Sequence, residues 1–202
     1  MTVESTPPNP SAKRWEFIWN LTLGFLVSAL SVLTAASNYM AFQADNKSSN
    51  LESEGDRLLA DSNAGYIQAN QSIILDYTMF DGEYLQRGVD DFAADYYKGN
   101  FSASLQASVD RGSAFDDQYY TEMYSTADQS FSDAFAKLDE ANAETERESG
   151  FQLAMLIASV GLAFAAYASL LSNARIMRAL FTMLAFLMLG VSALQFIVML
   201  VS

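Results

Sequence analysis

Residues 120–141 read YTEMYSTADQSFSDAFAKLDEA, and this stretch decides the fold of the polar middle of the chain. Aromatic, leucine and alanine side chains recur in it at steps of four and three residues over six intervals: Tyr120, Tyr124, Ala127, Phe131, Ala134, Leu138 and Ala141. This spacing places one side chain per turn on the same face of a helix and is typical of a coiled-coil seam. The stretch therefore predicts a helix that packs on a second helix through Tyr120, Tyr124, Phe131 and Leu138.

The residues upstream predict the partner of this helix. Steps of four, three and four residues link Leu85, Val89, Phe92 and Tyr96, and a similar series precedes them from Ile73 to Tyr84. The break between the two arms is predicted at residues 98–100, because glycine suits a helix C-terminus and Ser102 suits the N-cap of the next helix. An antiparallel helical hairpin is expected. Glycines elsewhere could bend an arm and make a short bundle instead: Gly55, Gly65, Gly82, Gly88 and Gly112.

Residues 43–150 contain both arms and carry nearly all of the charge. They hold 22 acidic residues against seven basic ones, whereas the whole chain is 51% hydrophobic. We interpret the acidity as the solvated face of a helical domain, which would repel nucleic acids. Weak binding of divalent cations to this face is a possibility. A dedicated metal site is not expected, because Asp76, Asp81 and Glu83 lack the ligand spacing of a calcium loop.

The residue types that most often carry catalysis are missing from the chain. It has neither histidine nor cysteine, so the commonest general base, the commonest transition-metal ligand and any disulfide are excluded. We find no glycine-rich phosphate loop and no arrangement of nucleophile, base and oxyanion donors. The sequence therefore predicts a protein that is not an enzyme and has no cofactor.

Apolar runs flank the acidic domain. Residues 17–42 contain no charged residue and exceed the roughly 20 residues that cross a bilayer core. A cleaved signal peptide is the alternative, but the core of such a peptide is typically about 7 to 15 residues. Residues 151–171 and 179–201 form two more uncharged runs. The chain is therefore predicted to have three transmembrane helices, with the lipid bilayer as its first partner.

Basic residues next to the spans predict their orientation. Lys13 and Arg14 precede the first span, and Arg175 and Arg178 lie in the turn of residues 172–178 between the second and third spans. Basic residues favour the cytoplasmic side. Residues 1–16 are then a disordered cytoplasmic tail, residues 172–178 a cytoplasmic turn, and residues 43–150 and the C-terminus are extracytoplasmic.

Small residues recur at every fourth position of the second span, at Gly161, Ala165 and Ser169. Such a repeat lets helix backbones approach closely, so it predicts helix packing or oligomer contacts. None of the three spans contains an ionisable residue. Because such residues usually mark ion pathways and proton relays, a pump or coupled transporter is not expected.

Two stretches resemble an uncharacterised bacterial family of three-span membrane proteins, whose domain is labelled as of unknown function. The first stretch runs from Ala64 to Ala69, where Tyr66, Gln68 and Ala69 look like the family's aromatic, Tyr, Gln, Ala signature. The second runs from Gly150 to Gly190 and is similar in its layout. The resemblance implies an extracytoplasmic helical hairpin and no particular activity.

The sequence thus predicts an all-α membrane protein with three transmembrane helices and an extracytoplasmic antiparallel helical hairpin or short bundle. A structural or accessory subunit is the expected function, in a homo-oligomer or with other membrane subunits. A sensory module is the first alternative, and it needs a cleft among the aromatic residues of 66–97. An oligomeric channel is the second alternative.

Overall fold

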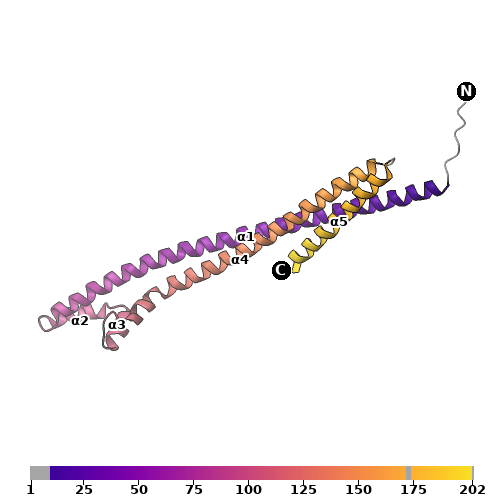
Figure 1. Cartoon of the computed structure of the whole chain (residues 1–202). Coiled ribbons are helices and arrows are strands. Elements are labelled where there is room, and N and C mark those ends of the chain that lie inside the picture. Colours follow the sequence, from indigo (N-terminus) through magenta and orange to yellow (C-terminus); the bar gives the residue numbers. More distant parts are fainter. Residues whose placement is uncertain (1–9, 172–173, 202) are drawn as a thin grey trace, which may run out of the picture. The chain divides into compact units, whose positions relative to one another are not determined.

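The computed structural model describes residues 10–171 and 174–201, and these residues form five helices and no strand. Figure 1 labels the helices: α1 (Pro10–Gln86), α2 (Asp91–Gly99), α3 (Ala103–Asp110), α4 (Asp117–Leu170) and α5 (Arg175–Val201). The chain divides into a first unit, residues 1–49 and 142–202, and a second unit, residues 50–141. The predicted all-α class is confirmed.

Three helices are long and apolar enough to cross a membrane, as the sequence predicts: α1, α4 and α5. Helix α1 already begins at Pro10, where the fixed φ of proline suits the first turn of a helix. Residues 10–16 of the predicted disordered tail are therefore helical, whereas residues 1–9 lie outside the described residues. Helix α5 begins at Arg175, within the predicted turn, and residues 172–173 also lie outside the described part.

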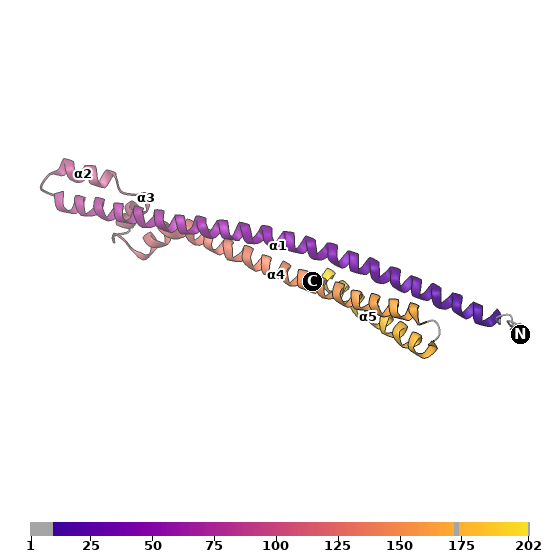
Figure 2. The same cartoon turned by 90° about the horizontal axis from the view of Figure 1, so that it is seen from above.

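Helix α1 ends before the predicted break. Gly88 adopts a φ of +75°, which glycine reaches without the steric cost that other residues meet, and the helix stops at Gln86. The Asp90 carboxylate then accepts a hydrogen bond from the Ala93 amide at 3.1 Å and caps α2. Figures 1 and 2 both show α2 lying beside the end of α1. Tyr97 of α2 lies at Gly82 and Ser102 lies at Asp76, so the chain reverses at residues 87–90 and α2 runs antiparallel to α1 instead of extending the ascending arm.

A helix boundary lies at the predicted residues 98–100, but the reversal between the two arms, which was predicted there, occurs earlier, at residues 87–90. Helix α2 ends at Gly99, and Asn100 is its C-cap. The Ser102 hydroxyl accepts a hydrogen bond from the Leu105 amide at 3.1 Å and caps α3. Both predicted signals, the glycine and the capping serine, therefore act where they were expected.

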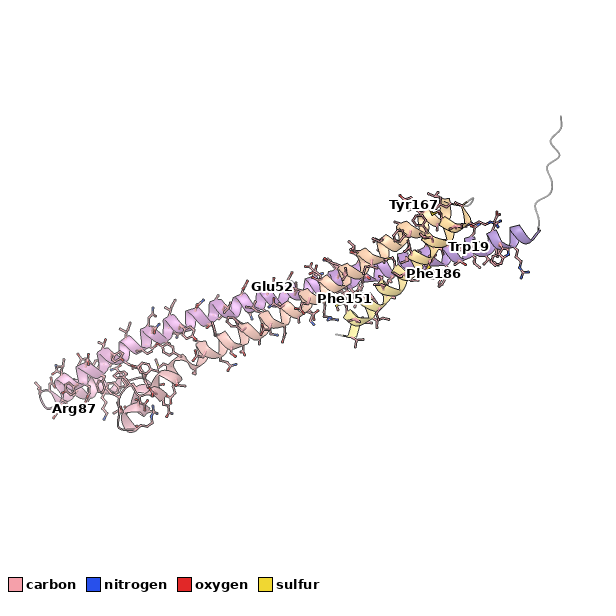
Figure 3. All side chains as sticks on the ribbon, in the orientation of Figure 1. Trp19, Glu52, Arg87, Phe151, Tyr167 and Phe186 are labelled. Carbon is pink, nitrogen blue, oxygen red and sulfur yellow. The ribbon has the colours of Figure 1, made fainter. Side chains whose placement is uncertain are left out.

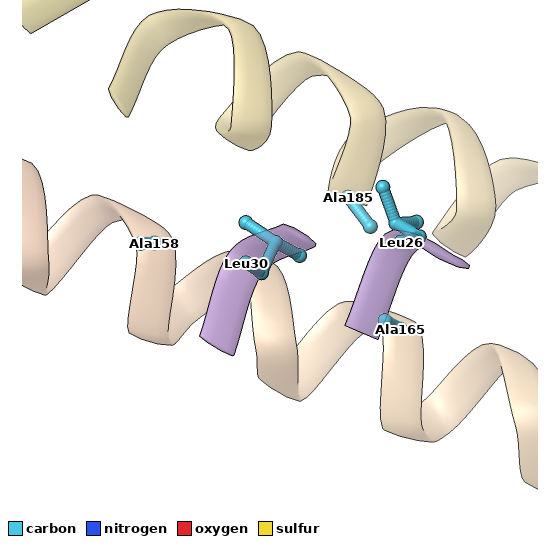
Figure 4. Close-up of a cluster of buried hydrophobic side chains, with 5 residues drawn as sticks. All are labelled: Leu26, Leu30, Ala158, Ala165 and Ala185. Carbon is cyan, nitrogen blue, oxygen red and sulfur yellow. The ribbon is translucent and has the colours of Figure 1, made fainter. Parts of the chain in front are cut away.

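In the first unit, α1, α4 and α5 meet around a small apolar cluster, drawn in Figure 4: Leu26, Leu30, Ala158, Ala165 and Ala185. A Cβ atom placed on Gly161 would lie 2.9 Å from Leu30 Cδ2 and 3.0 Å from Met188 Cβ. Within a bilayer the lipid tails are as apolar as leucine, so close packing rather than water exclusion stabilises helix contacts. Alanine and glycine make this approach possible.

In the second unit, α1 and α4 pack through small side chains. Buried positions of α1 recur at every seventh residue: Gly55, Ser62, Ala69, Asp76 and Glu83. The buried residues of α4 in this part include Ala127, Ala134 and Ala141. A Cβ on Gly65 would lie only 3.2 Å from Ala127 Cβ, and one on Gly55 only 2.9 Å from Leu138 Cδ2. The interface therefore has little room for large side chains.

The prediction that Phe131 lies in the seam is wrong, because α1 and α4 approach too closely to admit its ring. Phe131 is 45% exposed, and its ring packs on Phe135 of the same helix, with centroids 4.7 Å apart. The buried positions at this level of α4 belong to Ala127 and Ala134. A phenylalanine ring cannot enter such a narrow interface, so it lies beside it.

Substitution of Gly65 tests this packing. Gly65→Leu should force α1 and α4 apart and lower the stability of the second unit by about 1–3 kcal/mol. The measurement is loss of helical circular dichroism on heating the full chain in mild detergent. Ala64→Leu, at the exposed neighbouring position, is the matched control and should leave the transition unchanged. Equal effects of both variants would contradict the close approach.

Candidate functional site

Asp76 is the most densely bonded buried group of the second unit. Its side chain is 2% exposed. One carboxylate oxygen accepts from the Ser102 amide at 2.9 Å, and the other accepts from the Ser102 hydroxyl and from Tyr119 OH at 2.8 Å. A buried carboxylate is costly unless donors surround it, and here three donors do so. Asp76 therefore ties α1 to the start of α3 and to the first turn of α4.

The side chain of Tyr119 is fully buried, and its hydroxyl is the third donor to the Asp76 carboxylate. Burial, together with the hydrogen bond to Asp76, raises the pKa of the Tyr119 phenol above its ordinary value. The phenol therefore stays protonated and remains a donor throughout the neutral range. Rings from α1, from the segments before α3 and α4, and from α4 surround it, and the cluster includes Phe80, Phe101, Phe115 and Tyr120.

Hydroxyl groups of other tyrosines join α1 to α4 along the second unit. Tyr124 OH donates to Asn70 Oδ1 at 2.7 Å, and Tyr66 OH donates to Asp128. The hydroxyls of Tyr77 and Tyr120 lie 2.5 Å apart, and their hydrogen bond raises the pKa of Tyr120 to about 12. Two members of the predicted seam, Tyr120 and Tyr124, therefore contact the other arm through their hydroxyls as well as through their rings, and the Tyr124 ring lies 5.8 Å from that of Tyr66.

The start of α4 is held by one carboxylate. Asp116 Oδ1 accepts a hydrogen bond from the Tyr119 amide at 2.8 Å, which caps the helix. The Arg111 guanidinium binds both oxygens of Asp116 at 2.7 and 2.8 Å and, by this hydrogen bonding, lowers the pKa of that carboxyl well below its usual range. The cap keeps its charge in all but strongly acidic solution, and so fixes where Tyr119 enters the cluster.

The acidic residues near Gly82 are used as structural partners. Asp76 binds Ser102 and Tyr119, as described above, and Glu83 forms a bidentate ion pair with Arg87 at 2.7 and 2.9 Å. The hydrogen bonds from Arg87 lower the pKa of Glu83. Among the described residues, no group of three or more acidic side chains is placed to hold a metal ion.

A second feature of this unit is an exposed apolar edge, which we call the α1–α2 corner. It comprises the outward side chains of residues 84–96: Tyr84, Leu85, Val89, Phe92 and Tyr96. The sequence predicted the last four as a packed seam, and this is wrong. Gly88 ends α1, and α2 turns Ala94 inward, so Val89 and Phe92 are 82% and 87% exposed. Figure 3 labels Arg87 within this corner.

The glycine at the base of the corner has a packing role. A Cβ on Gly82 would lie 2.6 Å from two ring carbons of Tyr97. Tyr97 therefore lies flat against the backbone of α1, and this contact holds α2 in place. As a result, the face of α2 that carries Phe92 and Tyr96 points away from α1.

The residues of the small-residue repeat, the family-like motif and the rest of the seam differ in their burial. In the first unit, Gly161 and Ala165 are buried, but Ser169 is exposed and its hydroxyl donates to Ala166 O, so it lies outside the packed face. In the family-like motif, Ala69 is buried in the seam and Gln68 is exposed. Leu138 packs at Gly55, as the seam prediction expects.

The basic residues used to predict orientation differ in their surroundings. Arg14 and Arg175 are exposed, and the Lys13 side chain lies outside the described part. Arg178 is buried, donates to Asn20 Oδ1 at 2.8 Å and lies 5.6 Å from the ring centroid of Trp19. This cation–π contact ties the start of α5 to α1. Spacing along the chain gives no sign of it, because the partners are 158 residues apart.

Comparison with known proteins gives no relative. No family model matches the chain, and neither a curated protein nor a solved structure matches it. What the chain does is therefore inferred from its own residues.

Removing the Tyr119 hydroxyl tests the contribution of its hydrogen bond to Asp76. Tyr119→Phe keeps the ring but leaves the buried carboxylate with two donors, both from Ser102, so the free energy of unfolding should fall by about 1–3 kcal/mol. Thermal unfolding of the full chain in mild detergent measures the loss. Tyr96→Phe removes an exposed hydroxyl and should have no effect. A Tyr119→Phe variant as stable as the parent would show that the hydrogen bond contributes nothing.

Proposed function

We propose that the chain is a non-enzymatic membrane subunit that recruits another protein through the α1–α2 corner. Three apolar helices anchor it, and the acidic second unit projects outside the membrane as an antiparallel helical hairpin capped by α2 and α3. The observation that carries the proposal is the exposure of five large apolar side chains in this corner. Exposed apolar groups gathered in a polar domain usually mark a protein contact.

The composition of the corner fits a protein interface. Its residues include two tyrosines, a phenylalanine, a leucine and a valine. Aromatic side chains dominate the energetics of interface centres, because they bury much area at low entropic cost. Polar residues form a rim around them. The corner therefore has the apolar centre and charged border expected of a docking site.

The charges of the rim favour a partner that is not a second copy. Four exposed aspartates border the corner: Asp81, Asp90, Asp91 and Asp95. The two nearby bases are Lys98 and Arg87, and Arg87 is paired with Glu83. Two such acidic rims would repel each other. We therefore expect an apolar patch bordered by basic residues on the partner.

Hydrogen-bonded pairs support the antiparallel hairpin. As the position on α1 rises from Ser62 through Asn70 to Tyr77, the partner on α4 falls from Ala127 through Tyr124 to Tyr120. The extracytoplasmic placement rests on the bases beside the spans. Within this orientation, the corner and its acidic rim face the outside of the cell.

Contacts between aromatic rings argue against the sensory module. A sensory module needs a cleft among the aromatic residues of 66–97, but these rings fill each other's space. The Tyr77 and Phe115 rings are stacked at 4.2 Å, and Phe80 meets Phe115 edge-on at 5.4 Å. Docking at an exposed surface needs no such cleft.

Site-specific photocrosslinking tests the docking role. A photoreactive residue replacing Phe92 in the full chain, in its native membrane, should yield a product whose added mass is not that of this 22.2 kDa chain. Val89→Ser in the same chain should reduce this product at least fivefold, because it removes apolar contact area. Ile74 is also exposed, and the same probe there is the control and should not yield the product. A dimer-sized product, or equal products at both sites, would contradict the proposal.

Reporter fusions test the orientation. A reporter joined after Ser202 should be active only on the extracytoplasmic side, because Arg175 and Arg178 hold the preceding turn in the cytoplasm. A reporter inserted after Ala174 is the control and should give the cytoplasmic signal. The opposite pair of signals would place the acidic unit inside the cell and refute this part of the proposal.

A further inference from the structure

The first unit contains a pocket of about 110 Å³ between α1 and α4. Four of its lining residues come from α1 and three from α4: Met40, Gln43, Ala44, Lys47, Glu144, Arg147 and Phe151. Phe151 is labelled in Figure 3. All seven belong to one compact unit.

The lining is divided into an apolar and a charged part. Met40 lies within the first predicted span and Phe151 begins the second, whereas Lys47 and Glu144 lie seven residues further from those spans. At 1.5 Å per residue, Lys47 and Glu144 lie about 10 Å along the helices from Met40 and Phe151, and Arg147 lies about 6 Å from Phe151. All three charged groups therefore lie beyond the predicted ends of the two spans, on the side of the headgroup layer.

The charged part holds two cations and one anion. Lys47 Nζ lies 2.6 Å from Glu144 Oε1, and Arg147 Nη1 lies 3.0 Å from Glu144 Oε2. Burial alone would raise the pKa of Glu144, but the hydrogen bond from Lys47 and the charge of Arg147 outweigh it and lower that pKa. Glu144 therefore stays ionised, and the three groups together carry one surplus positive charge.

Contacts with α5 hold Arg147 in place beside the pocket. Arg147 Nε approaches Met199 O at 3.5 Å, near the end of α5. Gly150 allows this proximity, because a Cβ there would lie 2.0 Å from Met199 Sδ. Lys47 remains 62% exposed in its side chain and Arg147 29% exposed. Both cations are therefore accessible to a ligand, which would compete with Glu144 for them.

We propose that this pocket binds an anionic phospholipid, with its phosphate at Lys47 and Arg147 and the start of an acyl chain against Met40, while the buried Ala44 and Phe151 line the apolar interior of the pocket. Arginine and lysine are the usual phosphate ligands of proteins. A free phosphate ion would use the cations but not the apolar floor. The lipid uses both.

The acidity of the rest of residues 43–150 does not prevent this binding. At physiological ionic strength, exposed charges are screened over about 8 Å. The two cations would contact the phosphate directly, whereas the neighbouring Asp45, Glu146 and Glu148 do not line the pocket, and the other carboxylates of this segment except Glu144 lie farther along the helices. The local charge of the pocket therefore decides the preference for the headgroup.

Lipid titration of the full chain in neutral detergent, followed by native mass spectrometry, tests the proposal. Phosphatidylglycerol should bind, and Lys47→Gln or Arg147→Gln should weaken its binding about tenfold, because each removes a charge-assisted contact. Arg57→Gln removes an exposed charge in the second unit and is the matched control. Unchanged binding in both pocket variants would overturn the proposal.

A third variant separates a binding role from a structural one. Glu144→Gln removes the anion that competes for the two cations, so it should strengthen phosphatidylglycerol binding. If the three charges only held the fold together, the same variant would weaken binding or have no effect. Either of these results would count against the site.

Two further ligands identify the source of the phosphate. Phosphatidylcholine, whose headgroup carries no net charge, should bind at least fivefold more weakly than phosphatidylglycerol. Millimolar inorganic phosphate should not displace the lipid. Equal binding of the two lipids would refute charge recognition, and displacement by free phosphate would assign the pocket to that ion instead.

Discussion

Close contact between helix backbones is the constraint on which both units depend. In the first unit, Gly161 has Leu30 and Met188 pressed against its backbone. In the second, Gly65 lies against Ala127 in the same way. A single added methylene at such a position destabilises the packing, because the two helices cannot move apart without losing contacts along the whole interface. Large side chains must then lie beside the interfaces or at their ends.

The narrow interfaces also explain how polar groups are used. Small side chains expose backbone carbonyls, and hydroxyls bind to them directly: Ser62 Oγ donates to Ala127 O at 2.9 Å, and Ser192 Oγ donates to Ala154 O at 2.6 Å. Asp76 also joins helices, but as an acceptor of hydrogen bonds from three donors. Each of these groups is buried and would be costly if left unpaired. Their pairing specifies one register between the helices, which apolar contacts alone specify less well.

Two features remain that packing does not use, and both suggest binding. The α1–α2 corner leaves Val89 and Phe92 uncovered, although a well-packed domain would bury them. The pocket beside Lys47 and Arg147 gathers two of the seven bases of an otherwise acidic segment at the edge of the apolar spans. One surface suits a protein partner with a basic rim, and the other suits an anionic lipid. A membrane subunit that assembles with another protein would use both.

Composition and local backbone chemistry predict the helical class, the three helices with long apolar segments, the helix boundary at residues 98–100 and the cap at Ser102. Only folding decided which members of each row are buried. On α4 the predicted row contains Ala127, Ala134 and Ala141, which are buried, whereas the close approach of the backbones excludes the Phe131 ring of the same row. On α1 the buried face carries Gly55 and Ser62, which the sequence analysis did not select for packing. The partners of Asp76 and Arg178 were likewise beyond sequence reasoning, because chain spacing does not reveal contacts made only by folding.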